Sequence, residues 1–350
     1  MTHTIDQAAD EIATETLGRC PICGSVDRVT AYAGLTDYLF GAPGVWTLHT
    51  CASCGLIYLD PRPAPQALHL VYTAAYARRK APPGPPKQGL VSRVKAGVRR
   101  GYLANAYGYG AGVGLLDRAL GLAVPLFPNW RERLDHSVLQ LRAQPGGHLL
   151  DVGCGVGILV ETMGRLGWNA EGIDTDEEVV AVCRARGLRV TLGKLEEQHY
   201  PDNHFDVVTM MHVIEHVPDP VEMLREVRRI LRPGGQVLML TPNTRSLGHQ
   251  RFGMLWIGLD APRHLCLFSG ALLATAAQRA GFVRAEWRTN ARISYFNALN
   301  VFEFQSHQRN AYGSVSRESR IQAASFEREV RRRLRRDLEA GDELRLVAHK

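Results

Sequence analysis

The stretch LLDVGCGVGILVE, residues 149–161, constrains the fold more than any other part of the chain. Its apolar start is typical of a fully buried parallel strand, and its glycines permit a tight turn before apolar residues open a helix. The first N–H groups of such a helix have no internal partner and are ready to bind a ligand. The pattern predicts a doubly wound α/β sheet and leaves open which nucleotide the turn binds.

The spacing of the glycines argues against a dinucleotide. That fingerprint needs glycine at its first, third and sixth positions, and the sixth position here is Ile158. Asp151 ends the strand where a pyrophosphate would bind, and its carboxylate repels phosphate but suits a cation. S-adenosylmethionine fits, because it carries ammonium and sulfonium groups and no phosphate. A glycine turn with a solvated Asp151 is the alternative that this stretch alone leaves open.

A second acid follows at the next strand. The segment 169–173 is strand-like and ends in Asp174, about twenty residues after the glycines, from where a carboxylate can accept both hydroxyls of a ribose. Asp174 also begins DTDEEVVAVCRARG, a predicted helix with acids in its first turn and arginines at its end. Asp176 is the better-placed helix cap, so we predict the ribose role for Asp174.

Two further strand signals, 206–211 and 236–240, flank the amphipathic segment VEMLREVRRIL. With DVGCGVG, GIDTD, FDVV followed by IEHVPDP, and then RPGG, roughly residues 146–300 resemble the seven-stranded class I S-adenosylmethionine-dependent methyltransferases, in the subgroup of the ubiquinone-pathway O-methyltransferases. In that resemblance Asp151 and the glycines hold the methionine end, Asp174 the ribose, and the segment at 194–195 flanks adenine. The implied cofactor residues are Asp151, Gly153, Cys154, Gly155, Asp174, Thr175, Lys194, Leu195 and Met211.

The end of the chain fits the same fold. SGALLATAAQRAGF (269–282) predicts a capped helix, VRAEWRTNARI a strand, and GDELRLVAHK a final strand. In the family the last two strands form an antiparallel pair that closes the sheet. Between them lies the Arg-rich segment FEREVRRRLRRDLEA, which we interpret as part of a helical insertion near 303–341 at the sheet's edge.

Four of the seven cysteines form two Cys-x-x-Cys knuckles, CPICG (Cys20, Cys23) and CASCG (Cys51, Cys54). The glycine after each can take positive φ and let backbone N–H groups turn toward the sulfurs. Thiolates in this pattern predict a structural Zn(II), with paired redox disulfides or iron as alternatives. The other three cysteines, Cys154, Cys183 and Cys266, are expected in packing positions.

A zinc ribbon ahead of this core resembles bacterial methyltransferases of sugar, polysaccharide and secondary-metabolite pathways, among them zinc-containing C-methyltransferases of nucleotide-linked keto-sugars. The resemblance implies methyl transfer to an oxygen or carbon of a small-molecule, sugar or lipid-linked acceptor. The expected organisation is a tail and zinc ribbon over 1–60, a basic helical linker or lid over 61–145, and the α/β methyltransferase domain over 146–350.

The segment 78–142 concentrates positive charge. It holds twelve Lys or Arg against three acidic residues, a net +9, whereas the whole chain has +7. The apolar stretch GVGLLDRALGLAVPLFP lies beside the basic part. Such a combination can lie on an anionic membrane or grip an anionic or lipid-linked acceptor. The alternative is a lid helix that packs on the catalytic domain.

Methyl transfer from a sulfonium is an in-line displacement, so an oxygen or carbon acceptor needs positioning and a base. Amine methyltransferases typically carry an Asn/Asp-Pro-Pro-aromatic box where this chain reads MMHVIEH. Its His212, Glu215 and His216 are therefore candidates for deprotonating oxygen or carbon, although His216 could instead hold the turn. His264, in DAPRHLCLFS, resembles a family histidine that faces the active site, and Tyr76 is a candidate acceptor contact.

Two other functions compete with this interpretation. A zinc-ribbon RNA methyltransferase is suggested by the sequence pI of about 9.1, since phosphate contacts need Lys and Arg. The ribbon itself is nearly uncharged and its aromatics are not interleaved with basic residues, which disfavours nucleic acid. A non-catalytic S-adenosylmethionine-binding protein is the other, and the intact Asp151 and Asp174 argue against it.

The sequence also bears on location. No run approaches the roughly 20 apolar residues that span a bilayer, and the N-terminal MTHTIDQAADEIATET is acidic and polar. We therefore expect neither a signal peptide nor a spanning helix. The expected location is the cytoplasm, with peripheral contact at the inner face of the membrane through 78–142.

Overall fold

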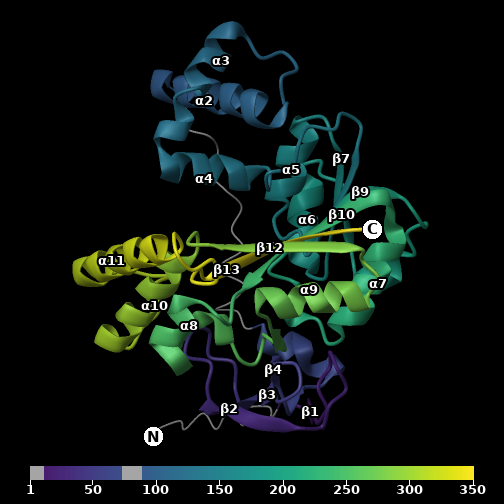
Figure 1. Ribbon diagram of the computed structural model, residues 1–350, viewed down its shortest axis with the longest axis vertical. Helices are drawn as coiled ribbons and strands as arrows, with labels where there is room; N and C mark the ends of the chain where they lie inside the picture. Colours follow the sequence, from purple (N-terminus) through teal and green to yellow (C-terminus); the bar gives the residue numbers. More distant parts are fainter. Residues whose placement is uncertain (1–11, 73–88) are drawn as a thin grey trace, which may run out of the picture. The chain divides into compact units, whose positions relative to one another are not determined.

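The structure, a computed structural model, describes residues 12–72 and 89–350 (Figure 1). Its largest sheet has seven strands in the order β12-β13-β10-β9-β6-β7-β8, as the α/β prediction requires. The chain divides into two compact units. The first unit comprises Met1–Arg79, Met210–Arg229 and Gln236–Lys350, and the second unit comprises Lys80–Thr209 and Ile230–Gly235.

The second unit contains the first strands of the α/β pattern. Strand β6 (His148–Val152) pairs in parallel with β7 (Asn169–Asp174), which pairs in parallel with β8 (Val190–Leu192). Helix α5 (Ile158–Arg165) follows β6, and α6 (Glu177–Ala185) follows β7. Because parallel strands bring their carboxyl ends to one edge, the ends of β6 and β7 place the two predicted acids on the same edge of the sheet.

The predicted caps and strand limits in this unit are close to those observed. The carboxylate of Asp176 accepts from the Val179 N–H at 3.1 Å, which confirms Asp176 as the cap of α6. Leu149 and Leu150 in β6 are fully buried, as expected for a strand covered on both faces. The unit also contains η4 (Leu195–Gln198) and most of β9 (Phe205–Met211).

The described part of the basic segment is mostly helical. Its elements are α2 (Leu90–Tyr107), α3 (Leu115–Gly121), η3 (Val124–Leu126) and α4 (Pro128–Ser137). The apolar stretch 112–127 forms two short helices with a turn between them. None of the described helices is both long and apolar enough to cross a membrane.

In the first unit, the cysteine knuckles belong to a four-stranded antiparallel sheet in the order β11-β4-β3-β2. Three of its strands are β2 (Arg28–Leu35), β3 (Trp46–Cys51) and β4 (Ile57–Leu59). The fourth, β11 (Cys266–Leu267), pairs Cys266 with Tyr58. Short elements nearby are β1 (Thr14–Glu15), β5 (Arg62–Pro63) and η1 (Pro65–Val71). The sheet of the N-terminal ribbon thus takes its fourth strand from the far part of the sequence.

The antiparallel end of the large sheet, from Gln236 onward, also lies in the first unit. Strand β13 (Glu343–His349) pairs antiparallel with both β10 (Leu231–Pro242) and β12 (Arg284–Asn290), which confirms the predicted antiparallel end. The predicted helix after Ser269 is α9 (Gly270–Arg279), with the Ser269 hydroxyl accepting from the Leu272 N–H. The remaining elements are η5 (Ile214–His216), α7 (Pro220–Ile230), α8 (Leu247–Phe252), η6 (Gly253–Leu255) and η7 (Ile257–Leu259).

The insertion between β12 and β13 consists of α10 (Ser294–His307) and α11 (Arg317–Arg333). It begins closer to β12 than the predicted residue 303, and its Arg-rich helix ends at Arg333 instead of continuing through the segment RRDLEA. The last buried side chain of α11 is Val330, and five arginines follow within 331–336. Like charges at helical spacing and the loss of an apolar face explain the end of the helix there.

Candidate functional site

The loop after β6 has three positions whose backbone conformation favours glycine. Gly153, Gly155 and Gly157 have φ of 65°, 51° and 72°, in the left-handed region that favours glycine. A Cβ on Gly155 would meet nothing within 4 Å, so the loop borders open space there. The Gly155 N–H donates to Asp174 Oδ2 at 2.8 Å, which fixes the loop to the end of β7.

Asp151 is fully buried, and its two oxygens differ. Oδ1 accepts from the Thr209 hydroxyl at 2.7 Å, whereas Oδ2 has no hydrogen-bond partner among the described residues. Burial raises the pKa of Asp151 to about 7, against the lowering effect of the Thr209 hydrogen bond. A buried carboxylate oxygen without a donor is costly. This oxygen therefore suits a cationic ligand.

Asp174 retains acceptor capacity. Its Oδ1 accepts from the Asp176 N–H at 3.0 Å and its Oδ2 from Gly155, one donor for each oxygen. A carboxylate offers about four lone-pair sites, so about two remain for ribose hydroxyls. The acid thus anchors the loop and can bind a ligand as well.

The remaining predicted cofactor residues have different surroundings. Thr175 is exposed beside Asp174, while Leu195 is buried at the start of η4. The Lys194 N–H donates to a carboxylate oxygen of Glu197 at 2.9 Å. Cys154 is buried, and its N–H donates to the carbonyl of Ile173 at 3.0 Å. Met211 ends β9 and belongs to the first unit. The cofactor roles of these residues remain predictions.

In the first unit, His212 bridges two buried carboxylates. Its Nδ1 lies 3.3 Å from Glu215 Oε1 and its Nε2 lies 3.1 Å from Glu343 Oε1. Burial alone would lower the pKa of His212, but the hydrogen bonds to both carboxylates outweigh it and raise the pKa to about 9. Burial likewise opposes ionisation of Glu215, but His212 lowers the pKa of Glu215 to about 2. His212 is therefore charged at neutral pH and donates from both nitrogens, an arrangement unsuited to a base.

Further polar groups complete this cluster. Glu343 is fully buried and also accepts from Arg292 and from the Asn290 amide. The second oxygen of Glu215 accepts from the Thr241 hydroxyl at 2.9 Å. Thr241, Asn290 and Glu343 lie in β10, β12 and β13, whereas Arg292 follows β12 and Glu215 lies in η5. The negative charge of each buried carboxylate is thus matched by a charged donor.

His216 and His264 differ from His212 because a backbone carbonyl fixes each ring. His216 Nδ1 lies 2.9 Å from the carbonyl of Arg263, and His264 Nδ1 lies 2.8 Å from that of Gly258. Since a carbonyl only accepts, each Nδ1 donates, and a neutral ring then presents its lone pair on Nε2. Burial, with the neighbouring His264, lowers the pKa of His216 to about 4, so His216 is neutral at pH 7. His216 therefore holds the turn and still offers a proton acceptor.

The rings of His216 and His264 lie close together, with Glu215 beside them. Their centroids are 4.8 Å apart, and the ligand atoms of Glu215, His216 and His264 lie within 4.8 Å of one another. Two imidazole nitrogens and a carboxylate can accept protons or hold a divalent metal ion. The bond from each Nδ1 to a carbonyl is the arrangement that orients metal-binding histidines in many proteins.

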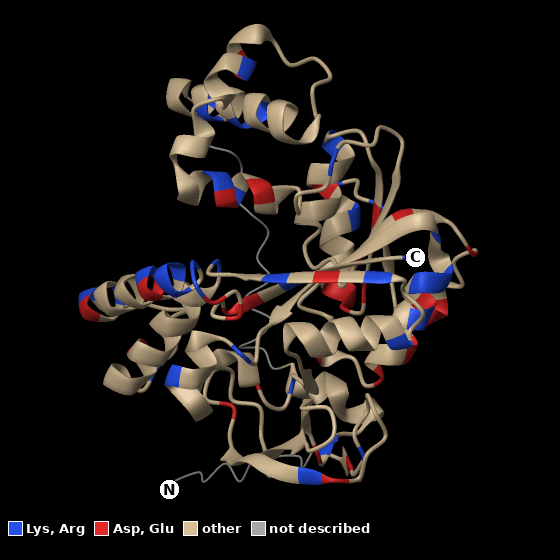
Figure 2. Cartoon of the chain, in the orientation of Figure 1, with Lys and Arg blue, Asp and Glu red and all other residues tan. Residues whose placement is uncertain are grey.

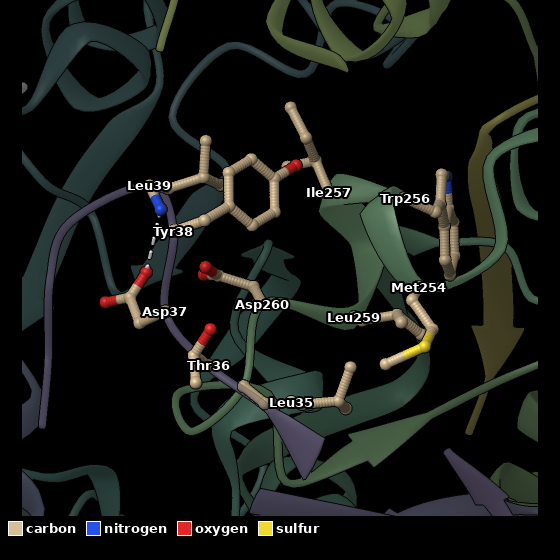
Figure 3. A pocket seen from close by; sticks show the side chains of 11 residues that line it. Leu35, Thr36, Asp37, Tyr38, Leu39, Met254, Trp256, Ile257, Leu259 and Asp260 are labelled. Atoms are coloured by element: carbon tan, nitrogen blue, oxygen red, sulfur yellow. Dashed lines mark hydrogen bonds between the residues drawn. The ribbon is translucent and has the colours of Figure 1, made fainter. Parts of the chain in front are cut away.

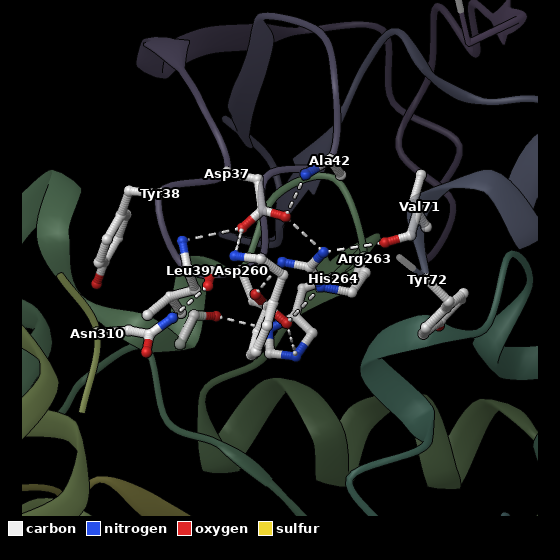
Figure 4. Close-up of polar contacts among 12 residues, drawn as sticks. Asp37, Tyr38, Leu39, Ala42, Val71, Tyr72, Asp260, Arg263, His264 and Asn310 are labelled. Carbon is white, nitrogen blue, oxygen red and sulfur yellow. Dashed lines mark hydrogen bonds and ion pairs between the residues drawn. The ribbon is translucent and has the colours of Figure 1, made fainter. Parts of the chain in front are cut away.

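A buried arginine organises the turn that carries His264 (Figure 4). Arg263 is 1% exposed, and its guanidinium donates to Asp260 Oδ1 and to Asp37 Oδ2, each at 2.7 Å. It also donates to the Val71 carbonyl at 3.0 Å. Burial would lower the pKa of Arg263, but its two carboxylate partners raise it above the usual value. Asp260 Oδ2 in turn lies 3.8 Å from His264 Nε2, so a negatively charged group of this network lies beside the histidine.

Beside this network lies a hollow lined by segments 35–39 and 254–261. Figure 3 shows the side chains of Tyr38 and Asp260 on neighbouring sides of it. The Tyr38 hydroxyl donates to the Leu255 carbonyl at 2.7 Å, and burial raises the pKa of Tyr38 well above its usual value. Asp260 thus borders both this hollow and His264.

The predicted acceptor contact Tyr76 lies outside the described residues. Tyr72, the other tyrosine of VYTAAY, has its ring centroid 6.3 Å from that of His216. Sequence reasoning missed Asp37, Asp260 and Arg263. Asp260 and Arg263 could have been noticed as charged neighbours of His264 in DAPRH. Asp37 had no such signal, because it is 226 residues from Arg263.

The four predicted metal-ligand cysteines do come together. The sulfurs of Cys20 and Cys54, and those of Cys23 and Cys51, are 3.5 Å apart, and all four lie within 4.8 Å of one another. The glycine after each knuckle has positive φ, 76° at Gly24 and 78° at Gly55, as predicted. No pair of the four is joined in a disulfide.

Known proteins match this chain over its central part. A family model described as "Methyltransferase domain" matches residues 128–285. The ubiquinone biosynthesis O-methyltransferase of Xanthomonas oryzae pv. oryzae is 40% identical over 196 residues, which are 49% of this chain and 80% of that protein. The chain belongs to the class I S-adenosylmethionine-dependent methyltransferases. The region matched by the methyltransferase model includes Asp151, Asp174, His216 and His264, while the four cysteines precede it.

Other methyltransferases match a shorter part. The ubiquinone biosynthesis O-methyltransferase of Aeromonas salmonicida is 40% identical over 105 residues, 28% of this chain and 44% of that protein. This chain spans about half the length of several such curated relatives, from 44% to 50%. A solved S-adenosylmethionine-dependent methyltransferase from Archaeoglobus fulgidus is 20% identical, with a TM-score of 0.42, over 64% of this chain and 92% of that chain.

The bridge at His212 predicts a pH-dependent contribution to stability. Its pKa of about 9 lies above the usual 6.5, so the charged form stabilises the fold fully below pH 6.5, and this contribution is lost as pH rises through 9. Replacing His212 by Asn keeps a residue that tolerates its φ of 55°. We expect the difference in unfolding free energy between wild type and His212→Asn to shrink across this range in urea titrations.

The control is His307→Asn, at an exposed histidine that ends α10. Its difference from wild type should stay constant over the same pH range. A His212→Asn difference that is equally constant would show that the bridge carries no charge in the folded protein.

Proposed function

We propose that this chain transfers the methyl group of S-adenosylmethionine to an oxygen or carbon atom of a small-molecule, sugar or lipid-linked acceptor. The single observation that carries the proposal is Asp151 Oδ2, a buried carboxylate oxygen without a donor, at the end of β6 beside an open glycine loop. Family membership supports it. The names of the relatives, ubiquinone biosynthesis O-methyltransferases, favour an oxygen acceptor.

The residues of the second unit fit the cofactor. Asp151 Oδ2 would pair with the ammonium group of the methionine end and thereby gain the missing hydrogen bond. Asp174 would accept from the ribose hydroxyls with its remaining lone pairs. Gly155 leaves room for the ligand, since a Cβ there meets open space. When bound, S-adenosylmethionine supplies an electrophilic methyl group for in-line displacement.

The histidines of the first unit have different roles in the proposed proton transfer. His264 and His216 each hold Nδ1–H on a carbonyl, so Nε2 can accept the proton of an acceptor hydroxyl or C–H acid. Asp260, 3.8 Å from His264 Nε2, would stabilise the imidazolium that results. His212 keeps Glu215 ionised and in place and takes no proton. The base is therefore proposed to be His264 or His216, whereas the low pKa of Glu215 makes that carboxylate a poor proton acceptor.

Cofactor binding is predicted to depend on pH through Asp151. Below its pKa of about 7 the carboxyl group is protonated and cannot pair with an ammonium group. The affinity for S-adenosylhomocysteine should rise severalfold between about pH 5.5 and 7.5 in calorimetry. Asp151→Asn should bind weakly and without this pH dependence. Asp174→Ala should weaken binding about tenfold or more, since a hydrogen bond to a charged group contributes roughly 1.5 to 3 kcal/mol.

Asp176→Ala is the matched control for this pair of variants. It removes the cap of α6, two residues from Asp174, and should cost about 1 kcal/mol of stability without changing the affinity. Wild-type affinity and an unaltered pH profile in both Asp151→Asn and Asp174→Ala would refute the cofactor site.

We also propose that the four cysteines hold one structural Zn(II). Supporting this are the tetrahedral thiolate preference of zinc and the backbone N–H groups near the sulfurs. Backbone N–H groups and the thiol of Cys23 lower the pKa of Cys51 to about 7 against the effect of burial, whereas burial raises the pKa of Cys20 to about 11 and that of Cys54 well above its usual value. A deprotonated sulfur is the form that binds metal.

Elemental analysis of protein purified without chelator should find one zinc per chain. Cys23→Ser should lose most of the metal and unfold at lower temperature, because metal binding contributes to folding. Cys183→Ser, at a cysteine buried beside the glycine loop, should keep the full metal content. Iron in the wild type, or no metal, would rule out this assignment.

Turnover should separate the catalytic histidines from the rest. With methyl-labelled S-adenosylmethionine and a panel of catechols, nucleotide-linked sugars and polyprenyl phenols, His264→Gln or His216→Gln should lower kcat by about 10²- to 10⁴-fold. Affinity for S-adenosylhomocysteine should stay within about twofold of wild type. His307→Gln should have no effect on either quantity. Full turnover in both variants would exclude these histidines as the base, and label in total RNA instead of the panel would favour the RNA methyltransferase alternative.

A further inference from the structure

The second unit exposes large apolar side chains on α2, α3 and the turn after α3. Nine of the 21 exposed large apolar residues in the described part of the chain fall within 90–127. Leu115 is 86% exposed, Leu90 76%, Leu126 77% and Leu116 73%. Isolated exposed leucines are ordinary, but a concentration of this kind marks an interaction surface. We call these nine side chains the exposed apolar patch: Leu90, Val91, Val94, Leu115, Leu116, Leu120, Leu122, Leu126 and Phe127.

The packing of α2 against α3 explains why these leucines remain outside. The two helices approach so closely that a Cβ on Gly101 would lie 1.6 Å from the Asp117 carbonyl oxygen. A Cβ on Gly121 would lie 2.3 Å from the Tyr102 nitrogen. Backbone thus meets backbone, which leaves no space between the helices for a leucine. The helix pair is complete without the exposed apolar patch, so the patch is available to another surface.

The same elements carry a positive charge. The described residues 89–127 contain five Lys or Arg and one acid, Asp117, a net +4. Asp117 is already paired with Arg100 at 2.7 Å. Arg93, Lys95 and Arg99 are exposed. Figure 2 shows Lys and Arg on α2 and α3, with little acidic colour beside them.

This combination selects one occupant. A second copy of the chain would bring the same positive charges together, which disfavours self-association. An anionic bilayer offers complementary charge to the arginines and an apolar interior to the leucines. The helices are also of suitable size. The 18 residues of α2 extend about 27 Å and α3 is shorter, so both can lie in the interfacial layer.

We propose that the α2–α3 pair binds the surface of an anionic lipid bilayer, with the exposed apolar patch inserted into the headgroup region. The leucines supply the hydrophobic part of the binding and the neighbouring basic residues supply the electrostatic part. The proposal goes beyond the proposed methyl transfer and does not depend on it, because it rests only on surface residues of the second unit. If both hold, the enzyme would meet a lipid-linked acceptor at the membrane surface.

Vesicle sedimentation tests the proposal without any acceptor. The full chain should partition onto vesicles of phosphatidylglycerol and phosphatidylcholine, and at least about tenfold less onto phosphatidylcholine alone. Raising NaCl from about 0.05 to 0.5 M should weaken the binding, since salt screens exposed charges. The triple variant Arg93→Gln, Lys95→Gln, Arg99→Gln should bind anionic vesicles at least about tenfold more weakly. Leu115→Asn with Leu116→Asn and Leu122→Asn should do the same.

The chain offers matched controls in the first unit. Val283, Ile321 and Leu338 are 77%, 58% and 70% exposed, and replacing all three by Asn should leave vesicle binding unchanged. So should Arg317→Gln with Arg320→Gln and Arg328→Gln, three exposed arginines of α11. Circular dichroism melting should give all variants a midpoint near that of wild type, because every altered side chain is exposed.

Several results would overturn the proposal. Wild-type protein that does not bind anionic vesicles would do so, as would equal loss of binding in the patch variants and the first-unit controls. A wild-type dimer in analytical ultracentrifugation that Leu115→Asn with Leu116→Asn and Leu122→Asn converts to monomer would assign the patch to self-association instead. The patch variants should all bind S-adenosylhomocysteine as wild type does. Failure of the membrane proposal is therefore distinguishable from failure of the methyl-transfer proposal.

Discussion

The buried guanidinium of Arg263 connects three segments of the first unit that lie far apart in the sequence. It pairs with Asp37 in the ribbon part and Asp260 in its own turn, donates to the Val71 carbonyl, and its own carbonyl accepts from His216. Removing one partner of a buried ion pair typically costs about 3 to 5 kcal/mol, because the other charge is left without compensation. The ribbon part and the turn that carries His264 are therefore joined through this guanidinium, in addition to the pairing of β11 with β4.

Three histidines of the first unit differ in protonation or hydrogen bonding because their surroundings differ. His212 lies between two buried carboxylates, and these raise its pKa to about 9, so it serves as a fixed cation. His216 has a carbonyl on Nδ1, and burial lowers its pKa to about 4, so it stays neutral with a free lone pair. His264 has the same carbonyl arrangement with Asp260 nearby. Burial and hydrogen-bond partners, and not residue type, therefore decide that His212 is charged and His216 neutral.

In the second unit, the candidate cofactor residues are brought together mostly by segments that are neighbours in the sequence. The glycine loop, Asp151 and Asp174 follow consecutive strands, so parallel pairing alone brings them to one edge of the sheet. Thr209 then satisfies one oxygen of Asp151 and leaves the other without a donor. The same unit carries the basic α2–α3 pair, whose close backbone packing keeps its leucines exposed. The second unit thus contains both the candidate cofactor residues and the surface on which basic and exposed apolar side chains gather.

The sequence by itself determined the features that depend on neighbours along the chain. The glycine loop, the cap at Asp176, the strand that ends in Asp174 and the knuckles at 20–24 and 51–55 follow from backbone preferences and local hydrogen bonds, and the structure confirms each of them. Only the tertiary structure decided the contacts between distant segments. The sequence near residue 37 does not indicate that Asp37 pairs with an arginine 226 positions later. Nor does the sequence indicate that β11 joins the ribbon sheet. Such contacts are selected by the burial of charge and the completion of sheet edges, and these depend on the whole fold.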